Sequence, residues 1–284
     1  MVDRWHRLAN VLCIENLGVL VFFLANAFVV VSVLGLYQGL AFAVAVYVVT
    51  TLLSLSLLGE ELMCLQIGAK PIQRRDMQLK ILPLTDIICE MAGLKNIRVK
   101  FLETDEVNAY AVGRRTIVVT RGLLRLPDKT VLAVLAHEAG HLVYGHSVVY
   151  LVIGGGNVFV TAGMWAVRLL CIIASGLFAV ISLCLHHRWI ALISATLGLI
   201  STAVLRAWTR LSSLFLYWSM RKNEFVADRF AFRLGFGYEL AEALEHDIPK
   251  QDAVSFFQEL SWTHPSNDER IAALQQLGVR YRSF

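Results

Sequence analysis

The chain alternates between long uncharged apolar stretches and more polar segments. No charged residue occurs between Glu15 and Glu60. A helix needs about 20 apolar residues to cross a bilayer, and this stretch is long enough for two such helices. We predict membrane spans at Leu17–Leu36 and Leu40–Leu58, joined by a turn at 37–39.

The polar segment 65–146 predicts a folded domain that starts with a helix at Asp76–Met91. Short runs with β character follow, and a turn is predicted at 113–115 between the last two of them. The strands are expected at Ile97–Leu102, Asn108–Val112 and Thr116–Thr120. A helix with apolar residues at helical spacing comes next, and Asp128 is its expected N-cap.

A second apolar region follows this domain. It is divided into three uncharged blocks, at 147–167, 169–185 and 189–205. Beyond it, a polar helical region is predicted around Arg221–Leu234, and a last helix at Asn267–Leu277. Ser266 and Glu269 have the spacing of a capping box at the start of that last helix.

The composition agrees with a membrane protein that also carries a polar part. Of the 284 residues, 57% are hydrophobic and 17% are charged, and the mean hydropathy is +0.60. The net charge of +4 is small and shows no clustered basic face, so nucleic-acid binding is not expected. Five cysteines without a CxxC spacing argue against a disulfide framework and for a reducing compartment.

Basic residues flank the first apolar stretch on both sides. Arg4 and Arg7 precede it, Lys70 and Arg74 follow it, and the turn at 37–39 has neither Lys nor Arg. Lys and Arg are in excess in cytoplasmic loops, so both outer flanks are predicted to be cytoplasmic.

The motif with the clearest chemistry is HExxH, formed by His137, Glu138 and His141. Positions i and i+4 share one face of a helix, so both imidazoles can reach one Zn²⁺ ion. Glu138 is then placed beside the open coordination position, where it can act as general base on the attacking water. His146 lies five positions after His141, and helical spacing predicts that it points away from this face.

A catalytic zinc needs a third protein ligand, and Glu224 is the best candidate. Asp228 lies one helical turn later and is expected to accept a hydrogen bond from a ligand histidine. The alternative is a solvated acidic pair balanced by Arg221, Lys222 and Arg229.

The ordered set of motifs resembles the HtpX-like membrane metallopeptidases, a family that includes the CAAX prenyl proteases. It comprises HExxH, an apolar hairpin, NEFxAD at Asn223–Asp228, and Thr263–Ser266 followed by Arg270. The resemblance implies a gluzincin fold, one Zn²⁺ per chain and endopeptidase activity. It assigns the metal ligands to His137, His141 and Glu224 and the catalytic glutamate to Glu138.

Two further segments could contribute to such a site. Asn108, Ala109 and Tyr110 resemble the family's segment beside the active site, where a strand could hold an extended substrate by backbone pairing. An ordinary edge strand explains these side chains equally well. His264 could stabilise the oxyanion of the tetrahedral intermediate, or it could only cap the last helix.

The predicted fold is a mainly α membrane protein with about four transmembrane helices and an α+β zinc metalloprotease domain of the gluzincin type. That domain is expected to carry a small antiparallel sheet. Residues 1–60 form an N-terminal membrane hairpin and 147–210 a second one. The catalytic domain is divided between 61–146, which includes the HExxH helix, and 211–284, which includes the third ligand.

His141 and Glu224 must lie on one side of the membrane to share an ion, so the chain between them crosses the bilayer an even number of times. We predict crossings at 169–185 and 189–205, with 147–167 continuing the catalytic helix. The alternative is a single long helix through the first two blocks that buries Arg168, at a cost of about 3 kcal/mol at the bilayer centre.

These features predict an endopeptidase that acts on protein or peptide substrates at the cytoplasmic side of a bacterial inner membrane. Both termini are expected in the cytoplasm, and the favoured substrates are membrane proteins in need of quality control. The alternatives are a processing or signalling protease that cuts one partner, and a non-catalytic zinc-binding scaffold. An intact Glu138 argues against the scaffold, because a structural zinc site needs no base.

Overall fold

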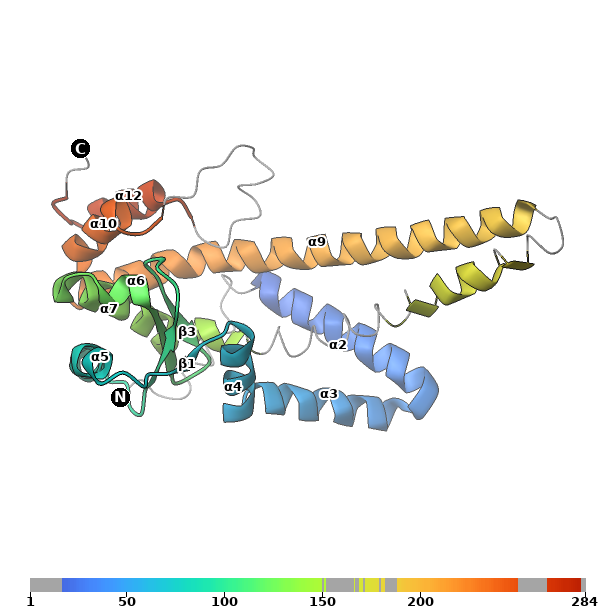
Figure 1. Ribbon diagram of the computed structural model, residues 1–284, viewed down its shortest axis with the longest axis horizontal. Coiled ribbons are helices and arrows are strands. Elements are labelled where there is room, and N and C mark those ends of the chain that lie inside the picture. Colours follow the sequence, from blue (N-terminus) through green and yellow to red (C-terminus); the bar gives the residue numbers. More distant parts are fainter. Residues whose placement is uncertain are drawn as a thin grey trace.

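A computed structural model describes residues 17–149, 151, 166, 169–170, 172–178, 180–181, 188–249 and 265–281. An apolar hairpin, α2 (Leu17–Gln38) and α3 (Leu40–Ser54), lies beside the long helix α9 (Arg188–Arg233). Figure 1 shows that α9 continues from there into the part of the molecule that holds the sheet. One helix therefore connects the apolar region to the polar domain.

The hairpin matches the predicted pair of apolar helices and turns at Gly39, whose φ of 87° favours glycine. Val30 and Tyr47 are buried between its helices, and the hydroxyl of Tyr47 donates to the carbonyl of Phe23 at 3.4 Å. Many other apolar side chains of the hairpin are exposed, for example Phe28 at 73%. Within the described part of the chain, no single helix is long and apolar enough to cross a membrane, but α3 and the next helix together meet that criterion.

The second predicted span is broken near its end. Helix α3 ends at Ser54, and the chain turns by 70° into α4 (Leu57–Gln66). Ser56 caps α4, because its hydroxyl accepts a hydrogen bond from the amide of Leu58 at 3.2 Å. Leu57 and Leu58 therefore belong to α4 and not to the second apolar helix.

The sheet is mixed, which corrects the prediction of an antiparallel one. Its order is β1-β2-β4-β3, with β1 at Lys70–Pro71, β2 at Arg98–Leu102, β3 at Ala109–Val112 and β4 at Thr116–Thr120. Strands β3 and β4 form the predicted hairpin, but β2 is parallel to β4. The loop after β2 crosses the end of the sheet to β3, which runs in the opposite direction to β2. The chain then turns back, and β4 fills the place between β2 and β3, parallel to β2. The short strand β1, antiparallel to β2, was not predicted.

Helices enclose the main core together with this sheet. They are α5 (Arg75–Ala92), α6 (Arg121–Leu124), α7 (Asp128–Tyr144), α10 (Gly237–His246) and α12 (Asn267–Gln276). The predicted capping box at Ser266 and Glu269 is present. Asp128 is the first residue of α7 and not its cap, because Pro127 occupies the cap position without a side-chain hydrogen bond.

Helix α9 is longer than predicted, with 46 residues and a length of about 69 Å. The apolar block 189–205 and the segment around Glu224 lie on this one helix, which no proline interrupts. It packs closely on α7. A Cβ atom added at Gly140 would lie 3.0 Å from Cα of Ala227. Residues 186–187, between the two predicted crossings, and most of the block 147–167 lie outside the described residues.

Candidate active site

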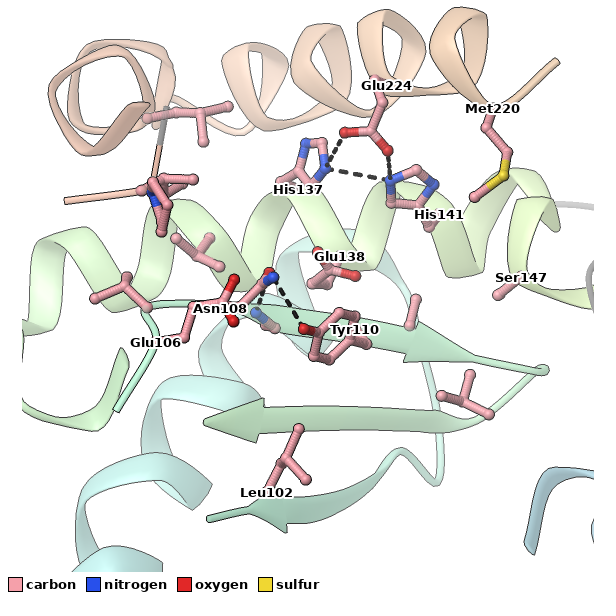
Figure 2. A pocket seen from close by; sticks show the side chains of 18 of the residues that line it. Leu102, Glu106, Asn108, Tyr110, His137, Glu138, His141, Ser147, Met220 and Glu224 are labelled. Carbon is pink, nitrogen blue, oxygen red and sulfur yellow. Dashed lines mark hydrogen bonds and ion pairs between the residues drawn. The ribbon is translucent and has the colours of Figure 1, made fainter. Parts of the chain in front are cut away.

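Two histidines one turn apart on α7 face a glutamate on α9 (Figure 2). The Nε2 atoms of His137 and His141 are 3.2 Å apart. The Glu224 carboxylate oxygens lie 3.3 Å from Nε2 of His137 and 3.2 Å from Nε2 of His141. All three side chains are buried, and they could hold one metal ion.

These distances fit a tetrahedral zinc site. Ligand atoms about 2.0–2.1 Å from a tetrahedral Zn²⁺ ion are about 3.3 Å from one another. The measured separations of 3.2–3.3 Å therefore require little rearrangement of His137, His141 and Glu224. Two imidazole nitrogens and a carboxylate are also the donor types that zinc prefers.

Asp228 holds His137 from the side opposite Glu224. Its Oδ1 atom is 2.8 Å from Nδ1 of His137. Arg270 donates to both Asp228 oxygens, at 2.9 Å from Nε and 2.6 Å from Nη2. When Nδ1–H of His137 donates to Asp228, the Nε2 lone pair faces Glu224 and is available to a metal.

The charges around His137 favour a cation. Burial and Arg270 act to lower the pKa of His137, but Glu224 and Asp228 outweigh them and raise it to about 10. Burial would raise the pKa of Asp228, yet Arg270 holds it below its ordinary value, so Asp228 is ionised. A divalent ion would supply the positive charge that these carboxylates favour.

His146 is placed differently from the sequence prediction. Its Nδ1 atom lies 3.1 Å from Nδ1 of His141, and its ring stacks on Tyr144 at a centroid distance of 5.7 Å. Burial and the charge of His141 lower the pKa of His146 to about 3, so the ring is neutral. Helical spacing failed here because α7 ends at Gly145, whose φ of 75° turns the chain back towards the site.

Glu138 is buried between α7 and the sheet. Figure 2 shows its carboxylate between the two histidines and β3. Burial raises its pKa, while the neighbouring His137 and His141 and a hydrogen bond from the backbone of Ala111 act to lower it. Glu138 is thus near the ligand cluster without belonging to it.

The predicted substrate segment consists of Asn108, which precedes β3, and the first two residues of β3, an edge strand that lies beside α7. Asn108 donates through Nδ2 to the Tyr110 hydroxyl at 3.0 Å, and its Oδ1 accepts from the amide of Ala109 at 2.9 Å. The side chain of Ala109 is buried in the core. The candidate oxyanion residue His264 lies outside the described residues.

A cavity of about 730 Å³ connects these groups. Its lining includes Asn108, Tyr110, His137, Glu138, His141, Glu224 and Arg270, and also apolar side chains from α4, β2 and α10. No pattern in the sequence predicted the apolar wall of this cavity, which is formed by Met63, Ile67, Leu102 and Met220. Arg270 appeared in the sequence only as the last residue of the ordered motifs, and no role was predicted for it.

Comparison with known proteins identifies relatives along most of the chain. Residues 71–277 match peptidase family M48. Protease HtpX of Ectopseudomonas mendocina is 31% identical over 236 residues, which cover 75% of this chain and 77% of that protein. A protease HtpX homolog of Thermoplasma acidophilum is 45% identical over 80 residues, or 25% of each chain.

The fold also resembles that of one solved structure. Ste24p of S. mikatae superposes with a TM-score of 0.51 at 18% identity. The match covers 88% of this chain and 61% of that chain, and it supports the fold alone. The match to the family over well over half of the sequence, together with the HExxH cluster, shows that this chain belongs to peptidase family M48 and is a metallopeptidase.

Proposed function

We infer that the chain is a membrane-embedded zinc endopeptidase with a gluzincin-type site. His137, His141 and Glu224 would hold one Zn²⁺ ion, and Glu138 would be the general base. The observation that carries this proposal is the convergence of three buried donor atoms, all within 4.8 Å of one another, beside a fourth buried side chain that can accept a proton.

The proposed reaction is hydrolysis of a peptide bond. The bound metal would act as a Lewis acid on the scissile carbonyl and on the attacking water. Glu138 accepts a proton from that water and passes it to the leaving amine. The backbone of Asn108, Ala109 and Tyr110 pairs with an extended substrate along the edge of β3, and His264 donates to the developing oxyanion.

A paired set of variants separates these roles. Glu138→Gln keeps the side-chain size but cannot accept the proton, so zinc should remain bound while turnover falls roughly 10²–10⁴-fold. Glu224→Ala removes a ligand, so zinc content and activity should fall together. For each variant, the zinc stoichiometry and the rate of casein hydrolysis are measured in detergent. Loss of zinc from Glu138→Gln, or full zinc and activity in Glu224→Ala, would contradict the assignment.

The membrane location is supported by the apolar surface of α2, α3 and the first half of α9. We propose about four transmembrane helices, with the active site and both termini on the cytoplasmic side of a bacterial inner membrane. This orientation follows from Lys70, Arg74 and Arg75, which are exposed after the hairpin, and from the absence of basic residues in its turn.

Labelling of single cysteines tests the orientation. In a background without the native cysteines, Gln38→Cys in the hairpin turn should react with a membrane-impermeant maleimide added outside intact cells. Gln73→Cys, equally exposed but beyond α4, should react only after the membrane is opened. Labelling of both positions from outside would refute the cytoplasmic site.

The biological role is proposed to be quality control of membrane proteins. Membrane proteomes of cells that contain the wild type or Glu138→Gln should then differ in many unassembled proteins. Accumulation of one uncut protein in the Glu138→Gln cells would instead indicate a dedicated processing protease.

A further inference from the structure

Helix α4 has an apolar face that nothing in the described part of the chain covers. Its exposed side chains are Leu57, Leu58, Leu62 and Leu65, with exposed fractions between 53% and 67%. Their spacing places them on one side of the helix, and we call them the leucine face. Figure 1 shows α4 lying across the end of the apolar hairpin, between it and the sheet.

The opposite face of α4 is fixed to the sheet by a buried acid. Glu60 accepts hydrogen bonds from Arg98 at 2.7 Å, from Thr116 at 3.0 Å and from the amide of Arg114 at 2.7 Å. Gly113 leaves room for this carboxylate, because a Cβ there would lie 2.3 Å from Cγ of Glu60. The sheet and α4 are therefore one rigid support, and the leucine face must point away from it.

Exposed basic residues lie near α4 in the fold and along the chain. Arg114 and Arg115 form the exposed turn that Glu60 holds against α4, and exposed Lys70 follows the helix. A helix that combines an apolar face with nearby basic residues is typical of helices that lie in the interface of a membrane containing anionic lipids.

The face of α4 directed to the protein also reaches the active-site cavity. Met63 packs, as do Tyr110 and Leu102, against a small buried cluster that includes Cys64 and Val112, and both Met63 and Ile67 line the cavity that contains Glu138. One short helix thus has leucines on one side and a wall of the substrate cavity on the other.

We propose that α4 lies in the lipid–water interface with its leucine face in the bilayer, so that the active-site cavity is held at the membrane surface. The continuity of α4 with the apolar hairpin and the 70° bend between them support this position. The substrate class follows, on the basis of the function proposed above. The enzyme would cut polypeptide segments close to where they leave the bilayer, next to side chains that fit the apolar wall of Met63 and Ile67.

Photocrosslinking tests the position of α4 without depending on catalysis. The full chain is reconstituted in vesicles of phosphatidylethanolamine and phosphatidylglycerol, with p-benzoylphenylalanine at position 65. The matched control has the same group at position 79 on α5, because Leu65 and Leu79 are 67% and 68% exposed. Zinc content checks that each variant is folded, and position 58 replaces position 65 if that variant does not fold.

Lipid adducts found by mass spectrometry should be roughly tenfold more abundant at position 65 than at position 79, because only the first lies at the interface. Equal adducts at both positions would overturn the proposal. Crosslinks from position 65 to another protein, or to another segment of this chain, would also overturn it.

A second experiment tests the substrate class. A single-span substrate carries one cleavage site either directly after the span or after a helical spacer of about 20 residues, which adds about 30 Å. The distant site should be cut roughly tenfold more slowly, since it rarely reaches a cavity held at the surface. Equal rates would refute the surface-held cavity, whereas no cleavage of either substrate or of casein would refute the proposed protease function itself.

Discussion

The charge on Asp228 is the residue-scale feature that most clearly serves the metal site. A buried carboxylate is costly unless it is paired and hydrogen-bonded. Arg270 pairs with Asp228 through two hydrogen bonds, and the remaining contact of Asp228 is to Nδ1 of His137. The pair therefore fixes the orientation of one proposed ligand, and it cannot be replaced by a neutral group without loss.

Asp228→Asn should test this function. Asn has nearly the same shape, but its neutral oxygen is a weaker acceptor for Nδ1–H, and Arg270 loses its hydrogen-bonded carboxylate and keeps the Glu224 carboxylate, 3.4 Å from Nη1. Zinc affinity or activity should fall roughly 10–100-fold, as measured by competition with a chromogenic chelator and by peptide hydrolysis. Arg229→Gln, at an exposed position next to it, is the control and should change neither. Unchanged affinity and activity in Asp228→Asn would make Asp228 a structural residue only.

His146 should have the corresponding role for His141. His146→Phe keeps an aromatic ring on Tyr144 but removes the Nδ1 atom that lies 3.1 Å from His141. We expect zinc affinity to fall by roughly tenfold or more, while thermal stability changes little. Tyr144→Phe, which keeps the ring stack and both nitrogens, serves as the control. Equal zinc affinity in His146→Phe and the wild type would show that the contact is incidental.

At the scale of elements, the crossing of α7 and α9 sets the distance between the histidines and Glu224. A Cβ at Gly140 would be 3.0 Å from Cα of Ala227 and 3.2 Å from Cβ of Phe230. Both neighbours are on the same helix as Glu224, so glycine permits the close approach that brings the carboxylate to 3.2–3.3 Å from the imidazoles.

Gly140→Ala should therefore weaken the site although alanine favours helices. Its gain in helix propensity is at most about 1 kcal/mol, whereas overpacking at such a contact costs about 1–3 kcal/mol. We expect lower zinc affinity and a lower melting temperature. Gly198→Ala on α9 has an ordinary contact at 3.9 Å and should be neutral or stabilising. A Gly140→Ala variant with normal zinc affinity would show that the helices can separate without moving Glu224.

At the scale of the whole molecule, the proposed metal joins two segments that are far apart in the sequence. His137 and His141 are on α7, and Glu224 follows the whole second apolar region on α9. A ligand that binds only the folded chain stabilises it by about 2.7 kcal/mol at 100 times its Kd. Removing zinc should therefore loosen the contact between these halves.

Chelation should lower the melting temperature of the wild type in detergent, and added Zn²⁺ should restore it. In Glu224→Ala, which lacks a proposed ligand, EDTA should have little effect, and this variant is the control. A wild-type melting temperature that does not respond to EDTA, when zinc analysis confirms removal of the ion, would mean that the site does not stabilise the fold.

The sequence alone determined the features that depend on neighbouring residues. The HExxH spacing placed His137 and His141 on one helical face, and apolar runs, turns and caps predicted most helices and the β3–β4 hairpin. These predictions were confirmed because helix periodicity, turn formation and capping act over a few residues. Glu224 was predicted as a third ligand because a zinc ion needs one and helical spacing pairs it with Asp228. The structure places its carboxylate beside the two histidines, and its role as a ligand stays a prediction.

Only the tertiary structure decided the features that depend on distant partners. The parallel pairing of β2 with β4 depends on how the chain passes the end of the sheet. The approach of His146 to His141 depends on the turn at Gly145, and the role of Arg270 depends on α12 packing against α9. Helix α4 is held against the sheet because the hydrogen-bond partners of Glu60 are on strands far along the chain. Such contacts are set by the packing of the whole molecule. Local patterns along the sequence do not indicate which distant surfaces will come into contact.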